Sequence, residues 1–99
     1  MIKHVVLFKL HPFENERLRL TKLEEIKVAL EELPKKIKEL RSLEVGININ
    51  PDETTDFALI TVFDSLDALR AYAIHPEHLK VTAIIGPVKK DRMCVDYEI

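Results

Sequence analysis

Two segments of this 99-residue chain have apolar side chains on both faces of the strand that each is expected to form. Residues 2–10 place Val6 on one face and Val5 and Leu7 on the other, and residues 56–63 are apolar on both faces as well. A strand of this kind is normally covered by protein on both sides, whereas a strand with one face in water alternates with polar residues. The sheet that contains these strands therefore needs two layers of cover.

A long amphipathic segment follows the first of these strands. Its apolar residues, Leu23 among them, recur at steps of three and four, and this pattern predicts a helix over residues 14–33. Glu14 or Asn15 is expected near the start of this helix. Pro34 is expected to end it, because proline disfavours helical backbone in the residue before it.

The other elements follow in an order that is typical of one sheet architecture. Ser65 is a plausible helix N-cap, and Pro76 suits the first position of a helix. The expected strands cover 2–10, 41–49, 56–63 and 89–98, and the expected helices cover 14–33, 64 to about 73, and 76 to about 85. This order predicts one α+β domain over residues 1–99, with a ferredoxin-like four-stranded antiparallel sheet and helices on one face.

Helices on one face leave the second face of the sheet uncovered within a single chain. Val5 and Leu7 lie on that face, and an exposed apolar sheet would be an unusually large patch for a monomer. Burying even ~600 Å² per chain contributes about 15 kcal/mol at ~25 cal/mol per Å², before the cost of association. We therefore expect a homodimer in which two sheets meet face to face and form a dimeric α+β barrel.

Composition excludes several classes of function. The 15 basic and 17 acidic residues give a net charge of −2 and are interspersed, so no nucleic-acid partner is expected. The apolar run after Lys3 is too short for a signal peptide or a membrane span. The lone cysteine, Cys94, fits a reducing, cytoplasmic location, and its mid-strand position predicts a core residue. Gly46 and Gly86 are isolated, so neither a phosphate-binding loop nor a cofactor is expected.

Titratable side chains are concentrated in one otherwise apolar stretch, Tyr72-Ala-Ile-His-Pro-Glu-His-Leu79. His78 is expected as the third residue of a helix, where positive charge is disfavoured, so its neutral imidazole can act as a general base without a metal. Tyr72 can donate a hydrogen bond to an oxyanion. His4 lies on the strand face that is expected to meet the helices, so it can reach the same pocket.

Each of these residues also has a structural interpretation. His75 fits a helix-entry residue that satisfies the first turn. His78 and His4 fit buried histidines with satisfied hydrogen bonds, and Tyr72 fits a core aromatic residue. His75 and His78, with Glu77 between them and His4 remote, fall short of a zinc motif, so no metal site is expected.

Four stretches of the chain resemble the stress-responsive dimeric α+β barrel (Dabb) domain family. They are residues 2–9, 43–46, 56–65 and 72–78, so the resemblance covers essentially the whole chain in order. It implies the same fold and a homodimer. The sequence is more distantly similar to a plant member, olivetolic acid cyclase, which closes a polyketide ring without a cofactor, and this implies catalytic roles for His78, Tyr72 and His4. This chain has Phe57 where that cyclase has a further histidine, and it has no tyrosine in the first helix.

Three functions stay open on this basis. The first is a homodimeric domain that binds a small hydrophobic or aromatic molecule in a pocket between sheet and helices. The second is a cofactor-independent cyclase, lyase or isomerase with His78 as general base, which a pocket walled by His78, Tyr72 and His4 would favour. The third is a structural oligomer without catalytic activity, which a pocket filled by phenylalanine side chains would favour. Whether the protein is an enzyme is left open.

Overall fold

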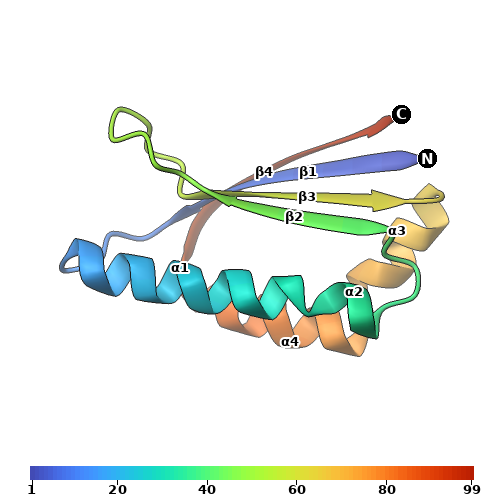
Figure 1. The fold of residues 1–99 in the computed structure, drawn as a ribbon, viewed down its shortest axis with the longest axis horizontal. Helices are drawn as coiled ribbons and strands as arrows, with labels where there is room; N and C mark the ends of the chain where they lie inside the picture. The colour runs from blue at the N-terminus through green and yellow to red at the C-terminus, as the bar shows by residue number, and fades with distance from the viewer.

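The computed structural model describes residues 1–99 and shows a four-stranded sheet with every helix on one side (Figure 1). In chain order the elements are β1 (Ile2–Leu10), α1 (Glu16–Glu31), α2 (Leu33–Lys36), β2 (Ser42–Ile47), β3 (Phe57–Phe63), α3 (Leu66–Ala73), α4 (Pro76–Ile85), the 3-10 turn η1 (Gly86–Val88) and β4 (Lys89–Glu98). The strand order is β2-β3-β1-β4, and all neighbours are antiparallel. This arrangement confirms the predicted ferredoxin-like architecture. None of the helices is long and apolar enough to cross a membrane.

The helices begin at residues whose side chains can satisfy the free amides of a first turn. Asn15 Oδ1 and Ser65 Oγ each accept a hydrogen bond from the amide three residues later, at 2.9 and 3.1 Å. His75 caps α4, because its Nδ1 accepts the amide hydrogen of Glu77 at 3.1 Å. The helix-entry interpretation of His75 is therefore confirmed.

The predicted helix over 14–33 is wrong at its C-terminal end. α1 ends at Glu31, and a separate short helix, α2, begins at Leu33 with Pro34 in its first turn. An amide in the first turn has no partner within the helix, so proline loses nothing there. Pro34 thus starts a new helix instead of ending the long one.

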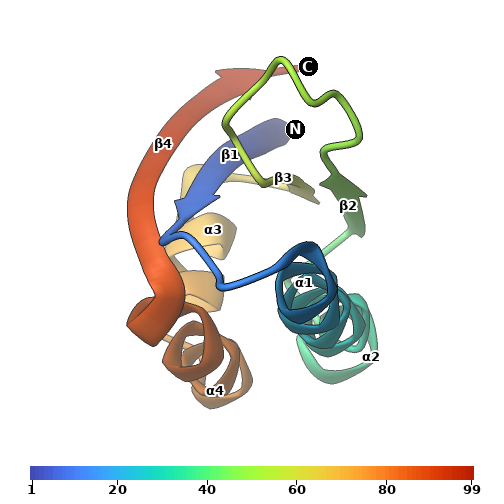
Figure 2. The same cartoon turned by 90° about the vertical axis from the view of Figure 1, so that its left-hand side faces the viewer.

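The hydrophobic core lies between the inner face of the sheet and the helices, around which the sheet curls (Figure 2). Residues with 2% or less exposure come from β1, β3, α1, α2 and α3 and from the residue after α2, and they include Val6, Phe57, Phe63, Leu23, Ile26, Leu30, Leu33, Ile37 and Tyr72. Phe8 stacks on Phe57 with ring centres 4.7 Å apart. The neighbouring strands β1 and β3 thus supply aromatic side chains to the inner face of the sheet, against which the helices pack.

The outer face of the sheet carries apolar side chains that nothing in the chain covers. Strand pairing places Val5 between Ile60 and Val95, and Leu7 opposite Met93. Leu7, Val95 and Met93 are 41%, 56% and 71% exposed. The structure therefore confirms that one chain covers only one side of its sheet.

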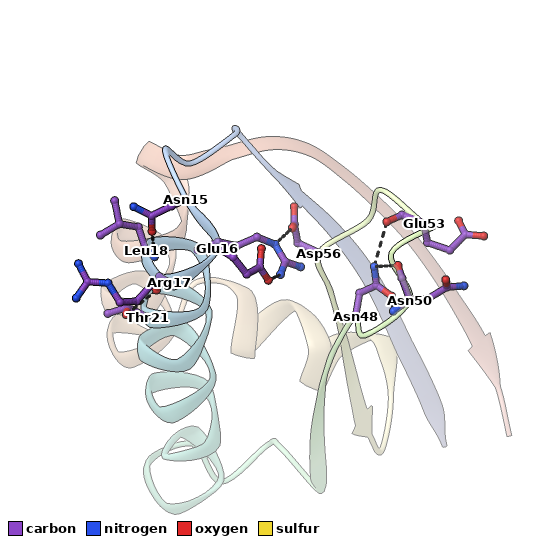
Figure 3. A network of polar contacts seen from close by, with 10 residues as sticks. Asn15, Glu16, Arg17, Leu18, Thr21, Asn48, Asn50, Glu53 and Asp56 are labelled. Atoms are coloured by element: carbon purple, nitrogen blue, oxygen red, sulfur yellow. Dashed lines mark hydrogen bonds and ion pairs between the residues drawn. The ribbon is translucent and has the colours of Figure 1, made fainter.

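An ion pair fixes the start of α1 to the end of the sheet that is remote from α3 (Figure 3). Arg19 Nε donates to Asp56 Oδ1 at 2.8 Å, and Arg19 also contacts Glu16 at 2.7 Å. The second oxygen of Asp56 accepts the amide hydrogen of Leu10 at 2.6 Å. Asp56 is 8% exposed, and the two hydrogen bonds from Arg19 and Leu10 offset the free-energy cost of burying its negative charge.

The strand predicted over 41–49 ends earlier, at Ile47. The Asn48 amide still donates to the Asp56 carbonyl at 2.9 Å, and the Asn48 side chain then bonds the backbone of the loop that follows. Its Nδ2 donates to the carbonyls of Asn50 and Glu53, and its Oδ1 accepts the Asn50 amide hydrogen at 2.9 Å (Figure 3).

Candidate functional site

A cavity of about 120 Å³ lies between β1, β4 and α4. Its lining combines apolar with polar residues, and consists of His4, Val6, Phe8, Leu30, Leu59, Tyr72, His78, Val81, Thr82, Ile85, Gly86, Lys89 and Arg92. The three site residues predicted from the sequence, His4, Tyr72 and His78, thus line one cavity. They come from β1 at the start of the chain and from the consecutive helices α3 and α4 near its other end.

His78 is the third residue of α4, as predicted. Its Nδ1 lies 3.0 Å from the carbonyl oxygen of Ala73. In a neutral imidazole this nitrogen carries the hydrogen and donates it, which leaves Nε2 as an acceptor. Burial lowers the pKa of His78 below its ordinary value of 6.5; the Ala73 carbonyl acts in the opposite direction, and the neighbouring side chains of His4 and Arg92 lower it further. The main cause of the neutral state is therefore burial, whereas the sequence pointed to the helix terminus.

Tyr72 is 2% exposed and stands between two other rings. Its ring centre is 5.0 Å from that of Phe63 and 4.4 Å from that of His78. The hydroxyl group is shielded from solvent and has no hydrogen-bond partner in the chain. Burial raises the pKa of this hydroxyl to about 12, so it stays protonated at neutral pH and is available as a donor.

His4 is 8% exposed and is held by β4. Its Nδ1 makes a short hydrogen bond with the carboxylate of Asp96, the residue directly opposite in the β1–β4 pairing. A neutral imidazole that donates from Nδ1 keeps Nε2 free. Sequence reasoning missed Asp96, although the alternation that puts Val95 on the outer face and the pairing of β4 with β1 could have placed it beside His4.

Cys94 is exposed, and its predicted role as a core residue is wrong. It lies on the inner face, but β4 is an edge strand, and its sulfur lies 3.3 Å from His4 Nδ1. Burial and the adjacent Asp96 raise the pKa of this thiol, and Arg92 acts in the opposite direction. A raised pKa reduces the thiolate fraction, so Cys94 lacks the activation expected of a nucleophile.

Potential metal ligands occur together at one place that the sequence did not indicate. His4 Nδ1, Cys94 Sγ and an Asp96 oxygen lie within 4.8 Å of one another. These atoms belong to ligand types that suit zinc, but His4 Nδ1 is already bonded to Asp96, and structural zinc sites use four ligands. We assign no metal to this group.

A second, larger depression of about 610 Å³ lies at the opposite end of α1, beside the β2–β3 loop. His11, the fourth histidine, lies on its edge. Three of the charged residues that line it form one network, in which Arg19 donates to both Asp56 and Glu16. This depression is therefore built around a structural ion pair, and the cavity with His4, Tyr72 and His78 is the better candidate for chemistry.

Comparisons with known proteins agree on one family. The model of the stress responsive A/B barrel domain (Dabb) matches residues 2–99. A dimeric protein of unknown function with a ferredoxin-like fold from Bacteroides fragilis is 45% identical, with a TM-score of 0.93 over 99% of this chain and 95% of that one. A dimeric ferredoxin-like protein of unknown function from Thermobifida fusca is 31% identical, with a TM-score of 0.84 over 99% and 90% of the two chains.

More distant proteins share the fold alone. Hydroxynitrile lyase from Passiflora edulis is 14% identical, with a TM-score of 0.80 over 99% of this chain and 92% of that one. No curated protein matches the sequence. The family model covers nearly the full length, and the 45% identical structure has the same fold, so the chain belongs to the stress responsive A/B barrel domain family.

Proposed function

We propose that this protein binds a small hydrophobic or aromatic molecule in the cavity lined by His4, Tyr72 and His78. The observation that carries the proposal is the composition of this cavity: apolar side chains such as Val6 and Leu59 line it together with His4, Tyr72 and His78. Ligand pockets commonly combine apolar walls with a few polar groups that fix orientation. Phe8 lines this space, but Phe57 and Phe63 do not, so phenylalanine side chains do not fill it, which argues against a purely structural role.

The size of the cavity limits the ligand. An engineered cavity of about 150 Å³ in another protein binds benzene, so a space of about 120 Å³ suits a single ring or a short branched chain. His78, which is only half-buried, stands near the opening. The ligand's apolar part would lie against Val6 and Leu59, with its polar atoms toward Tyr72 and His78.

Binding is tested by thermal unfolding and calorimetry with benzamide and benzoate. A ligand that binds only the folded protein raises the unfolding temperature by mass action. We expect at least one of the two compounds to raise it, and His78→Ala to weaken that binding while folding is retained. His11→Ala, which removes an exposed histidine outside the cavity, should bind as the wild type does. If neither compound binds the wild type, or if His78→Ala binds with unchanged affinity, the proposed function is wrong.

The binding protein is proposed to be a homodimer joined through the outer face of the sheet. The uncovered residues on that face, such as Val95 and Met93, need a partner surface of the same apolar character. A second copy of the chain supplies this surface by symmetry. The relatives from Bacteroides fragilis and Thermobifida fusca are described as dimeric, which supports the same assembly here.

A second candidate function is cofactor-independent proton transfer at a carbon next to a carbonyl group. It is favoured by the contact between His78 Nδ1 and the Ala73 carbonyl, which presents the unprotonated Nε2 as a base. His78 would take the proton from carbon, and the Tyr72 hydroxyl would donate a hydrogen bond to the oxygen of the resulting enolate. The Passiflora edulis protein shows that the fold can carry a lyase, although its 14% identity says nothing of the residues here.

This chemistry is tested by exchange of the methyl hydrogens of acetophenone in deuterated water, followed by nuclear magnetic resonance. We expect the wild type to accelerate the exchange, and His78→Ala to lose about 100-fold or more of that acceleration, as general-base removal does. His11→Ala is again the matched control. Equal exchange with and without the wild-type protein would exclude this function and leave ligand binding unaffected.

A further inference from the structure

Two positively charged side chains at the cavity have no carboxylate partner in the chain. Lys89 and Arg92 lie on the helix side of β4, opposite Leu10 and Phe8 of β1, and both line the cavity. Both residues are exposed, so they mark its opening. Neither takes part in any ion pair of the structure.

The residues that line this cavity include no acid to balance the two positive charges. No aspartate or glutamate lines the cavity, while His4 and His78 do. Asp96, the carboxylate on the same face of β4, is engaged by His4. Besides burial, the nearby Arg92 guanidinium lowers the pKa of His78, as a cation close to an imidazole does.

We propose that the ligand of this cavity is a small monocarboxylate, an aromatic or short branched acid whose carboxylate contacts Arg92 and Lys89. The inference rests on the proposed ligand-binding function of the same cavity and adds the charge of the ligand to it. The apolar end of the acid lies among side chains such as Val6 and Leu59, and its charged end faces the opening. A guanidinium group pairs well with a carboxylate because two parallel N–H donors match its two oxygens.

The donors at the opening fit a carboxylate better than a phosphate ester. A phosphate monoester brings a second negative charge and a third acceptor oxygen. The one neutral hydroxyl near the two cations, that of Thr82, already donates to the Leu79 carbonyl at 2.9 Å. A carboxylate has only two acceptor oxygens, and the Arg92 guanidinium with the Lys89 ammonium group can satisfy both of them.

The experiment compares benzoate with benzamide, which has nearly the same shape and no charge, by calorimetry on the intact protein. We expect benzoate to bind more tightly than benzamide, and added NaCl to weaken the binding of benzoate alone. Arg92→Gln and Lys89→Gln should each reduce the affinity for benzoate about fivefold, as loss of an exposed charge pair does. Both variants should bind benzamide as the wild type does.

Lys90→Gln is the matched control, because it removes the same charge from β4 at a residue that does not line the cavity. It should leave the ratio of the two affinities unchanged. Equal affinity of the wild type for benzoate and benzamide would overturn the inference and keep the binding function, whereas failure of both compounds would overturn both. Tighter binding of phenyl phosphate than of benzoate would overturn the assignment to carboxylates.

Discussion

Replacing Tyr72 with phenylalanine should stabilise the protein and weaken its binding of ligand. The hydroxyl of Tyr72 is buried without a partner in the chain, and a buried polar group of this kind costs about 1–3 kcal/mol. Phenylalanine keeps the ring contacts with Phe63 and His78 at 5.0 and 4.4 Å. We therefore expect the free energy of unfolding to rise by about 1 kcal/mol, the lower end of that range, since some of the cost is relieved by local movement.

Urea unfolding at a fixed protein concentration measures this change, because the stability of a dimer depends on concentration. For a domain of this size, about 1 kcal/mol corresponds to a rise of roughly 4–8 °C in the unfolding temperature. Tyr97→Phe, at the other tyrosine, is the control; Tyr97 is 45% exposed, and its replacement should change stability by less than about 0.5 kcal/mol.

The same variant should bind benzoate or benzamide less tightly than the wild type, since the ligand loses a hydrogen-bond donor. A variant that is more stable but binds more weakly would show that the Tyr72 hydroxyl contributes to ligand binding and lowers the stability of the free protein. If Tyr72→Phe instead loses about 1 kcal/mol or more of stability, the hydroxyl has a partner in the folded protein and this reasoning is refuted.

Three other changes test the fold, the assembly and the pH response. Arg19→Ala leaves the 8% exposed Asp56 carboxylate without its ion-pair partner, so urea unfolding should show a loss of about 2–4 kcal/mol; a loss under about 0.5 kcal/mol would contradict this. Val95→Lys places a charge on the uncovered sheet face, so light scattering should report the 11.5 kDa monomer with helical content retained, and a persistent dimer would place the interface elsewhere. The lowered pKa of His78 means that the unfolded chain binds more protons than the native protein as the pH falls through 6.5, so stability decreases there. His78→Gln should lose less stability than the wild type between about pH 7 and about pH 5, and equal losses would contradict the cause assigned to the pKa.

Prediction from the sequence succeeded where the determining interactions are local. The alternation in residues 2–10 gives β1 its bounds without error, and Pro76 with His75 before it gives the start of α4. Both predictions depend on residues close together in the chain. In β1 the side chains alternate with a period of two, and in α4 the capping side chain of His75 bonds the amide of Glu77. Prediction failed at Pro34, because proline is compatible both with the end of one helix and with the first turn of another.

The amino-acid sequence alone determined the order of the elements, the apolar sheet face that one chain cannot cover, and three residues of the candidate site. Tertiary structure decided which other groups join them. Asp96 meets His4 across a separation of 92 residues, and Arg92 and Lys89 reach the same cavity because β4 runs antiparallel to β1. These contacts depend on the register between strands from opposite ends of the chain, and so do the exposure of Cys94 and the volume of the cavity. Periodicity within a segment cannot supply that register, since it reports which residues share a face and not which residues of another strand lie opposite them.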